Sequence, residues 1–358
     1  MDKNTEEERI INIILKKNPE YKLGKILGKG GFGLVFEIKY KNRVFATKLI
    51  KRKTNDSIME LELLRNPIGP GIVKANKIFL EHEGNNIYYL IIMEKAQLKS
   101  LRNLYRDLHF HNIFKLIFKS PFELIGDNLL RFFAKQIIKE LELLHRSNYC
   151  HFDIKPENIL IFSHITLKIG DFDLLRNPEA LKNENGKFCI PGGTRGYLTP
   201  EYYLNNHLID IKDAKKQDYF SLGSTLFELK YGKEMLNYID YSDKTTTADL
   251  IVDLIQKAMN EIKSKKISDK GFIEFLYSLI QYRPDERLNF EKIYRNKWLH
   301  KNSEELQNIC EIYYLDDRKK LLEINKSDFL IDKKKYLDNN RKDEDNRRIR
   351  RHKFIFKD

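Results

Sequence analysis

A glycine-rich stretch near the N-terminus could hold phosphate groups through backbone amides. Residues 28–35 read Gly-Lys-Gly-Gly-Phe-Gly-Leu-Val, the pattern G-x-G-x-x-G-x-V. Glycine at Gly28, Gly30 and Gly33 would let the amides lie over phosphates without side-chain clash. Dinucleotide-binding folds use nearly the same pattern, but there the loop opens a helix, whereas residues 34–40 continue as a strand. The pattern favours a hairpin over phosphates, with a plain flexible hairpin as the alternative.

A lysine after this loop could bring positive charge to the same phosphates. Lys48 lies fifteen residues after Gly33, in residues 44–48, which read Val-Phe-Ala-Thr-Lys. Because side chains alternate between the faces of a strand, Val44, Ala46 and Lys48 share one face. A single lysine in such a place is often a strand-end residue that extends to water. It becomes informative if an acidic side chain and a phosphate lie beside it.

Two further motifs, rich in acidic and amide side chains, follow in the same chain. Residues 151–158 read His-Phe-Asp-Ile-Lys-Pro-Glu-Asn, and residues 170–173 read Gly-Asp-Phe-Asp. With the glycine-rich loop and Lys48 before them in this order, the chain resembles a eukaryotic-type protein kinase of the serine/threonine type. The resemblance covers residues 21–300. It implies ATP and Mg²⁺ as cofactors for transfer of the γ-phosphoryl group to hydroxyl groups of a protein substrate.

The resemblance implies a role for each residue of these motifs. Asp153 resembles the catalytic aspartate that receives the hydroxyl proton, and Lys155 resembles the lysine that steadies the γ-phosphate. Asn158 lies five residues after Asp153, as in the family pattern H-R-D-x-x-x-x-N, and with Asp171 it resembles the metal ligands. Lys48 resembles the lysine that anchors the phosphates.

The family pairs this lysine with a glutamate of the next helix, and two glutamates are available. Counting back from Ile72, where the next strand of the family begins, favours Glu60 over Glu62. Only twelve residues separate Lys48 from Glu60, so we expect a helix that is short at its start. The alternative for either glutamate is a solvated charge on the helix.

Position alone implies the adenine site. The apolar residues that would enclose the base are Leu27, Val35, Ala46 and Leu160. Met93 falls at the gatekeeper position, and backbone groups of Glu94 and Ala96 lie where the hinge hydrogen bonds form in the family. All of these residues could equally be ordinary core.

A segment on the substrate side separates protein kinases from small-molecule kinases of similar fold. Residues 193–201 resemble the pattern G-T-x-x-Y-x-A-P-E, with threonine in place of the alanine. The resemblance implies a buried ion pair between Glu201 and Arg287. Thr194, together with Lys155, favours serine and threonine over tyrosine as substrates.

One departure from the family pattern concerns regulation. Phe152 replaces the arginine of the H-R-D motif, which in the family gathers a phosphorylated activation segment by charge pairing. Residues 174–193 contain no Ser, Thr or Tyr. We therefore expect a kinase that does not depend on phosphorylation of that stretch. Phe152, with Ile154 and residues 171–175, loosely resembles Wee-type kinases.

A second departure is Asp173, which stands where the family has glycine. It adds negative charge near the metals and could shift metal affinity without abolishing transfer. Asp173 is also the best support for the alternative reading, a pseudokinase that binds nucleotide or serves as a scaffold. Retention of Lys48, Asp153, Asn158 and Asp171 argues against that alternative.

Alternation and helical periodicity predict the elements that must position these residues. We expect a helix over residues 5–17, strands over 21–27, 34–40, 44–50, 73–82 and 86–93, and helices over 58–64, 129–145, 221–229 and 272–282. Strands that precede helices indicate an α+β chain in two lobes. The resemblance implies that this is a bilobal protein-kinase-like fold with a β-rich N-lobe and a mainly helical C-lobe. Asp218 resembles the aspartate that opens the central C-lobe helix and has a structural role.

The same pattern predicts the domain organisation. We expect an N-terminal helical extension over residues 1–20, a kinase domain over 21–300 with lobes at 21–95 and 96–300, and a charged basic tail over 301–358. Residues 103–127 read as an insertion between helices.

Composition limits the compartment and the partners. The chain has 358 residues, a net charge of +13 and three cysteines without metal-like spacing. We expect reduced thiols and a cytoplasmic location, with the nucleus as an alternative. No apolar run approaches the about 18–20 residues of a transmembrane segment. The basic residues are spread out, so no nucleic-acid partner is expected. Their densest cluster, residues 347–353, could dock an acidic partner or an anionic surface.

Overall fold

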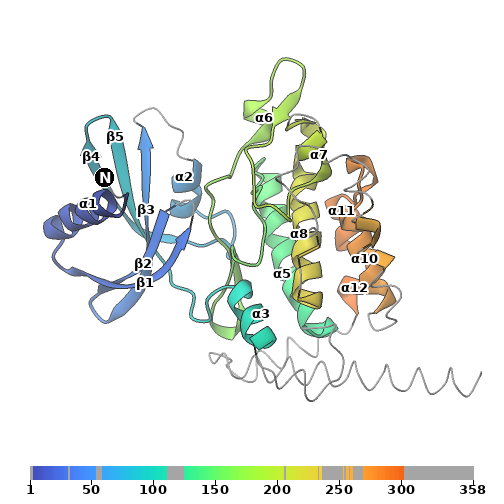
Figure 1. The fold of residues 1–358 in the computed structure, drawn as a ribbon, viewed down its shortest axis with the longest axis horizontal. Helices are drawn as coiled ribbons and strands as arrows, with labels where there is room; N and C mark the ends of the chain where they lie inside the picture. Colours follow the sequence, from blue (N-terminus) through green and yellow to red (C-terminus); the bar gives the residue numbers. More distant parts are fainter. Residues whose placement is uncertain are drawn as a thin grey trace, which may run out of the picture.

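The computed structural model has two lobes, a smaller one built on a β-sheet and a larger one built mainly from helices (Figure 1). The structure describes residues 3–30, 33–53, 59–110, 125–204, 207–232, 234–235, 253, 255–257, 259–260 and 269–301. The expected basic tail, apart from residue 301, lies outside the described residues.

Five antiparallel strands form the sheet of the N-lobe, in the order β1-β2-β3-β5-β4. They are β1 (Tyr21–Gly30), β2 (Gly33–Tyr40), β3 (Arg43–Lys53), β4 (Ala75–Glu83) and β5 (Asn86–Met93). Residues 87–92 of β5 are all buried, which explains why this strand reads as a continuous apolar run. Both faces of the sheet are therefore covered at β5.

Helix α1 (Lys3–Lys17) covers one of these faces. The buried cluster between helix and sheet consists of Ile10, Ile11, Ile14, Phe36, Leu49, Tyr88 and Leu90. Ion pairs of Arg9 with Glu83 (2.5 Å) and of Lys17 with Glu81 (2.6 Å) link the helix to β4. Leu49 of β3 belongs to this cluster and points toward α1. Because neighbouring side chains of a strand point to opposite faces, Lys48 points to the other face of the sheet, where α2 (Met59–Arg65) lies.

Helix α8 (Ala214–Tyr231) is the centre of the C-lobe and is buried over most of its length. The helices α5 (Asp127–Arg146) and α10 (Lys270–Leu279) pack against it, and α12 (Lys297–His300) packs against both of these. One face of α5 is apolar and buried, with Leu130, Phe133, Ile137, Leu141 and Leu144. The remaining elements are α3 (Leu101–Phe110), α6 (Pro178–Leu181), α7 (Pro200–Leu204), α11 (Phe290–Tyr294) and the 3₁₀ turns η1 (Ser163–Ile165), η2 (Ile211–Asp213) and η3 (Pro284–Glu286).

Two small two-stranded sheets complete the C-lobe, and one of them joins the lobes. The pairs are β6 (Ile159–Ile161) with β7 (Leu167–Ile169), and β8 (Lys187–Cys189) with β9 (Leu208–Asp210). Ile169 accepts a backbone hydrogen bond from Val73 (3.0 Å) and donates one to Gly71 (2.7 Å). A Cβ on Gly71 would overlap the Glu140 side chain, so glycine is required at this close approach. The turn that follows β7 is thereby fixed against the N-lobe.

The bilobal α+β fold expected from the sequence is confirmed, with corrections to individual elements. Helix α8 begins seven residues before the predicted start at 221, and α10 ends three residues before the predicted end at 282. Residues 103–127 are not an insertion throughout, because 103–110 belong to α3 and residue 127 begins α5. Residues 111–124 lie outside the described residues.

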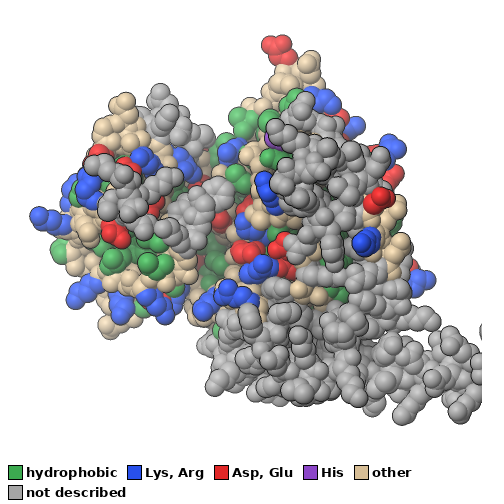
Figure 2. Space-filling view, in the orientation of Figure 1, with side chains coloured by type: hydrophobic (Ala, Val, Ile, Leu, Met, Phe, Trp, Pro, Cys, Tyr) green, Lys and Arg blue, Asp and Glu red, His purple; other side chains and the backbone are tan. Residues whose placement is uncertain are grey.

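The described surface carries charges of both signs. Lysine, arginine, aspartate and glutamate side chains are interspersed on the face seen in Figure 2. No helix among the described residues combines the length and the apolar character that a membrane span needs. Of the three cysteines, Cys150 and Cys189 form no disulfide in the described part of the chain, and Cys310 lies outside the described residues.

Candidate active site

Lys48 lies at the centre of a charged cluster between the lobes. Its Nζ lies 3.4 Å from Oε1 of Glu60 on α2. The same nitrogen lies 2.8 Å from Oδ1 of Asp171 and 2.6 Å from Oδ2 of Asp173. Arg52, further along β3, lies 3.3 Å from Asp173 and 3.6 Å from Glu60. Two cationic and three carboxylic side chains thus meet at one place.

The local structure explains why Glu60, rather than Glu62, reaches Lys48. Helix α2 places Glu60 on its buried face together with Leu63 and Leu64, and Glu62 is exposed. Lys48 pairs with Val35 of β2 across the sheet and is itself buried. The sequence-based choice between the two glutamates agrees with this geometry.

Asp171 reaches the cluster from a strained turn after β7. Its φ of 60° lies in the left-handed region, which aspartate tolerates better than most residues. The next side chain, Phe172, is buried against the ring of His151, with ring centroids 5.3 Å apart. His151 Nε2 also bonds to the carbonyl of Gly170 (3.1 Å). These contacts fix the turn and direct Asp171 to Lys48.

Mutual charge sets the protonation of the cluster. Burial alone would lower the pKa of Lys48, but the charges of Glu60, Asp171 and Asp173 outweigh it and raise that pKa. Burial raises the pKa of Glu60 to about 8, against the charge of Lys48. Burial would also raise the pKa of Asp173, but Lys48 holds it below its ordinary value. Both shifts favour the charged forms, a cationic Lys48 beside an anionic Asp173.

The Asp153 carboxylate, in the loop of residues 151–158, accepts four hydrogen bonds. Its Oδ1 accepts hydrogen bonds from the backbone N–H (2.9 Å) and the hydroxyl (2.7 Å) of Thr194. Its Oδ2 accepts from Lys155 Nζ (2.7 Å) and Asn158 Nδ2 (3.0 Å). Lys155 also donates to the Thr194 hydroxyl (2.5 Å). The structure therefore brings Asp153, Lys155 and Asn158 together, and it adds Thr194 to them.

The backbone of this loop is held from behind by α8. Asp218, which is wholly buried, accepts hydrogen bonds from the N–H groups of His151 (2.9 Å) and Phe152 (2.8 Å). His145 Nε2 lies 2.8 Å from the same carboxylate. Burial would raise the pKa of Asp218, but its bond to His145 and nearby charge hold that pKa below the ordinary value. Asp218 thus has the structural role that its resemblance implied.

The oxygen donors in the cleft suit a small divalent cation. Asn158 donates to the backbone carbonyl (2.8 Å) and carboxylate of Asp153, and its side-chain oxygen accepts no hydrogen bond from the described residues. The Asp171 carboxylate is about one-third exposed, so it keeps access to the cleft. Amide and carboxylate oxygens are the ligands that Mg²⁺ prefers. Asn158 and Asp171 therefore fit the metal that the resemblance implies.

The glycine-rich loop and the adenine-site residues border the same cleft. Gly28 pairs with Val35, which pairs with Lys48, so the hairpin lies next to the charged cluster. Gly30 pairs with Gly33 at the end of the hairpin. A Cβ built on Gly28 would have no heavy atom within 4 Å. Residues 31–32 lie outside the described residues.

The residues assigned to the base are only partly buried, as expected for the walls of a cleft. Leu27 is exposed, and Val35, Ala46, Met93 and Leu160 are half-buried. Ala46 pairs with Met93 across the sheet. Met93, Ala96 and Leu160 pack on the main core from its edge. These residues therefore lie where a planar ligand could enter between the lobes.

The segment after β5 presents backbone groups to this cleft. The N–H of Glu94 donates to Lys74 (3.1 Å), and the Glu94 carboxylate binds Lys168 (2.7 Å). The N–H and C=O of Ala96 have no hydrogen-bond partner among the described residues. Of the two residues assigned to the hinge, Ala96 thus offers both a free donor and a free acceptor.

On the substrate side, the expected pair of Glu201 and Arg287 is confirmed. Two parallel hydrogen bonds join them, from Nη1 to Oε1 (2.8 Å) and from Nη2 to Oε2 (2.6 Å). Both side chains are buried. The segment 193–201 is further fixed by hydrogen bonds from Tyr197 to Glu228 and from Thr199 to Gln217.

Phe152 replaces a charge contact with an apolar one. Its φ of 63° turns the backbone, and its ring stacks on Phe188 of β8, with centroids 5.4 Å apart and an interplanar angle of 22°. Both rings belong to a buried cluster with Ile190 and Ile209. Phe188 also pairs with Ile209 of β9. The segment that a phosphate would order in the family is thus held here by apolar burial.

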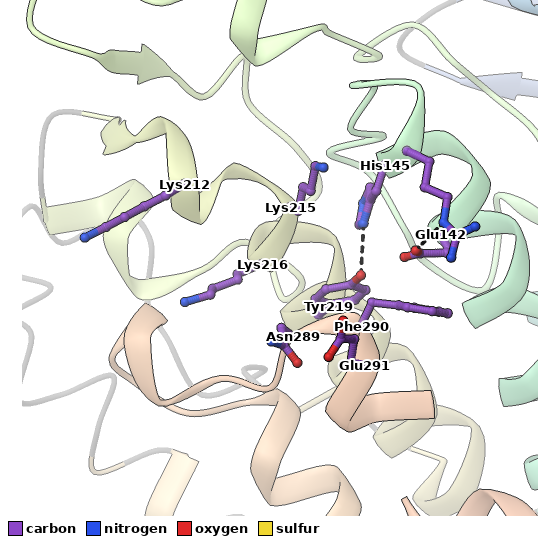
Figure 3. Close-up of a pocket in the computed structure, with 10 residues that line it drawn as sticks. Glu142, His145, Lys212, Lys215, Lys216, Tyr219, Asn289, Phe290 and Glu291 are labelled. Carbon is purple, nitrogen blue, oxygen red and sulfur yellow. Dashed lines mark hydrogen bonds and ion pairs between the residues drawn. The ribbon is translucent and has the colours of Figure 1, made fainter. Parts of the chain in front are cut away.

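A separate pocket of about 350 Å³ lies in the C-lobe (Figure 3). It is lined by Glu142, His145, Arg146, Lys212, Lys215, Lys216, Tyr219, Asn289, Phe290 and Glu291, from α5, η2, α8 and α11. Its two buried polar side chains, His145 and Tyr219, are bonded to each other (3.1 Å). None of the lining residues belongs to the charged cluster, so this pocket offers no second reactive centre.

Three features together define a domain of the protein-kinase class: the two-lobed fold, the contact of Lys48 with Glu60 and Asp171, and the hydrogen-bonded group of Asp153, Lys155 and Asn158. A sequence model of the protein kinase domain matches residues 21–299. The chain therefore belongs to the eukaryotic-type protein kinase superfamily.

Curated relatives are serine/threonine kinases. The chain is 26% identical over 306 residues to the serine/threonine-protein kinase cds1 of Schizosaccharomyces pombe, which covers 81% of this chain and 60% of that protein. It is 26% identical over 302 residues to CBL-interacting serine/threonine-protein kinase 15 of Arabidopsis thaliana (80% and 62% covered). An Aurora kinase of Debaryomyces hansenii is 26% identical over 298 residues (80% and 63%). The chain spans about 60% of the length of these relatives.

The sequence analysis missed one member of the cluster, Arg52. Alternation along β3 puts Arg52 on the same face as Lys48, so its direction was predictable. Its partner Asp173 is 121 residues away, and no local pattern joins the two.

Proposed function

We propose that this chain is an ATP- and Mg²⁺-dependent protein kinase that phosphorylates serine and threonine hydroxyl groups. The observation that supports this most directly is the contact of Lys48 with Glu60 and Asp171. The buried Asp153, bonded to Lys155 and Asn158, supports it further. Lys48, positioned by Glu60, would bind the nucleotide phosphates. Asp153 would receive the proton of the attacking hydroxyl group, and Lys155 would steady the γ-phosphate.

The remaining assigned residues would position the nucleotide and its metal. Asn158 and Asp171 would hold Mg²⁺, which supplies positive charge to the phosphates when bound. The glycines of the hairpin would cover the phosphates. The base would lie among the half-buried apolar residues, with hydrogen bonds to the backbone of Glu94 and Ala96.

Transfer of radiolabelled phosphate to dephosphorylated casein tests this function. Asp153→Asn should lower the rate by at least about a hundredfold, the usual effect of losing a catalytic base. Equal signals from both proteins would remove the case for catalysis by this chain. Nucleotide binding without any transfer would favour the pseudokinase alternative, for which the contact of Asp173 with Lys48 is the relevant observation.

We also infer that activity does not require phosphorylation of residues 174–193. The support is the absence of hydroxyl side chains in that stretch and the burial of Phe188 against Phe152. Protein made in bacteria and treated with phosphatase should be fully active. A requirement for an upstream kinase would contradict this inference.

The basic cluster at residues 347–353, outside the described residues, is proposed to dock an acidic partner or an anionic surface of the cytoplasm. Its support is composition alone. Truncation after Asn346 should weaken binding to anionic vesicles more at low salt than at high salt, because salt screens exposed charges. Equal losses at both salt concentrations would contradict a charge-driven contact.

A further inference from the structure

Asp173 contacts the side-chain nitrogen of Lys48, the group to which the proposed function assigns the nucleotide phosphates. Its Oδ2 lies 2.6 Å from Lys48 Nζ, the shortest of the three carboxylate distances to that nitrogen. The Asp173 side chain is only 6% exposed, so water screens this contact little. A glycine at this position, as in the family, could make no such contact.

The backbone around Asp173 is also fixed. Arg176 Nη1 donates to the carbonyl oxygens of Asp173 (3.1 Å) and Leu175 (2.8 Å). Leu175 is buried, and its N–H donates to Phe172 (3.0 Å). The carboxylate is therefore held at Lys48 by the fold of the turn rather than by a mobile side chain alone.

Asp173 changes the balance of charge in the cleft. Without it, Lys48 and Arg52 would face two carboxyl groups, those of Glu60 and Asp171. With it, two cations face three carboxyl groups. A nucleotide brings further negative charge to the same nitrogen. Phosphates and the Asp173 carboxylate therefore compete for Lys48.

We propose that Asp173 makes nucleotide binding depend more strongly on a divalent cation, because it competes with the phosphates for Lys48. A cation beside Asp171 offsets the negative charge that Asp173 adds, whereas a metal-free nucleotide meets that charge in full. The proposal rests on the proposed function, in which Lys48 binds phosphates. It makes Asp173 a specificity-determining residue at a position where the family has glycine.

Arg52 gives the proposal a second, opposite prediction. Arg52 lies 3.3 Å from Asp173 Oδ1, so it can keep the carboxylate when Lys48 turns to a phosphate. Among the described residues, removing Arg52 leaves Lys48 as the one cationic side chain paired with the Asp173 carboxylate, since Arg176 binds the carbonyl oxygen of Asp173 instead. Arg52→Met should therefore weaken the binding of a metal-free nucleotide, whereas Asp173→Asn should tighten it.

Calorimetric titration of the full chain with ADP tests the proposal, once with excess EDTA and once with MgCl₂. Asp173→Asn should tighten the binding of metal-free ADP by about tenfold, or about 1.4 kcal/mol. Its effect on ADP with magnesium should be several-fold smaller. Lys51→Met is the matched control for Arg52→Met, since Lys51 binds Glu6 of α1 on the opposite face of β3. That control should change neither affinity.

The outcomes separate this inference from the proposed function. If wild-type protein binds ADP but Asp173→Asn leaves the ratio of the two affinities unchanged or weakens metal-free binding, the inference is wrong and the proposed function stands. If wild-type protein binds ADP under neither condition, both are wrong. Circular dichroism checks that each variant is folded. If Asp173→Asn is unfolded, Asp173→Ser replaces it in the same titrations. The inference is then wrong if Asp173→Ser does not tighten the binding of metal-free ADP or if Arg52→Met does not weaken it.

Discussion

Lys48 and Asp171 lie 2.8 Å apart although 123 residues separate them in the sequence. One comes from the middle of an N-lobe strand and the other from the turn after β7. That turn is also joined to the N-lobe by the backbone bonds between Ile169 and residues 71–73. The reactive groups of the two lobes are therefore brought together both by backbone pairing and by charge. Because the backbone pairing remains when a charge contact is lost, such a loss should lower activity more than it lowers the stability of the fold.

Glu60 and Glu62 provide the first test of this relationship. Glu60→Gln replaces the carboxyl group that contacts Lys48, so kcat/KM for protein phosphorylation should fall by about tenfold or more, which corresponds to about 1.4 kcal/mol. Glu62 lies on the exposed side of the same short helix, so Glu62→Gln should have a kcat/KM close to that of the wild type. Steady-state kinetics with casein measure both. Equal losses in the two variants would show that Glu60 has no special role.

The local chemistry of the site was predictable from the sequence. Asp153, Lys155 and Asn158 lie within one short loop, so their spacing alone brings them together. Alternation on β3 gave the face of Lys48, and counting back from Ile72 favoured Glu60. The pair of Glu201 and Arg287 was expected from the resemblance alone. Other contacts between distant segments, such as Arg52 with Asp173, were not predictable, because no local period records which faces meet.

Two misplaced helix ends have the same cause. Helix α8 begins with residues 214–220, whose polar side chains break the apolar period, yet Asp218 is buried because it binds backbone groups of the catalytic loop. Helix α10 was predicted to continue to Tyr282, but the carbonyl oxygens of Gln281 and Tyr282 accept hydrogen bonds from Arg287. In both places a buried polar contact from elsewhere in the chain decides the local structure.

The buried ring of Phe188 should keep residues 174–193 in an ordered conformation. Its ring is 2% exposed and stacks on Phe152. Phe188→Ala should cost about 3–5 kcal/mol of local stability, and trypsin should then cut more quickly after Lys182 and Lys187, with lower kinase activity. Phe188→Leu keeps most of the buried volume and should show a smaller change. Unchanged cleavage in Phe188→Ala would mean that β8–β9 pairing alone holds the segment.

Two arginines four residues apart provide a matched test of burial. Arg287 is buried and forms two bonds to Glu201, so Arg287→Met leaves an unpaired buried carboxylate and should lower the free energy of unfolding by about 3–5 kcal/mol. Arg283 pairs with Asp285 at the surface, and Arg283→Met should cost at most about 1 kcal/mol. Urea unfolding measures both variants. Similar values for the two would contradict a structural role for the buried pair.

Asp218 predicts the pH dependence of stability. In the folded protein its pKa is held below the ordinary value of 3.8. The ionised carboxylate therefore stabilises the fold at pH values above about 3.8, and this contribution is lost as the pH falls through the pKa of the folded state. Asp218→Asn loses an acceptor for one of the two backbone N–H groups and should be about 1–3 kcal/mol less stable near neutral pH. Urea titrations at a series of pH values should show the gap between variant and wild type narrowing below about pH 4. A gap that stays constant or widens toward acid would mean that the Asp218 carboxylate does not stabilise the loop through its charge.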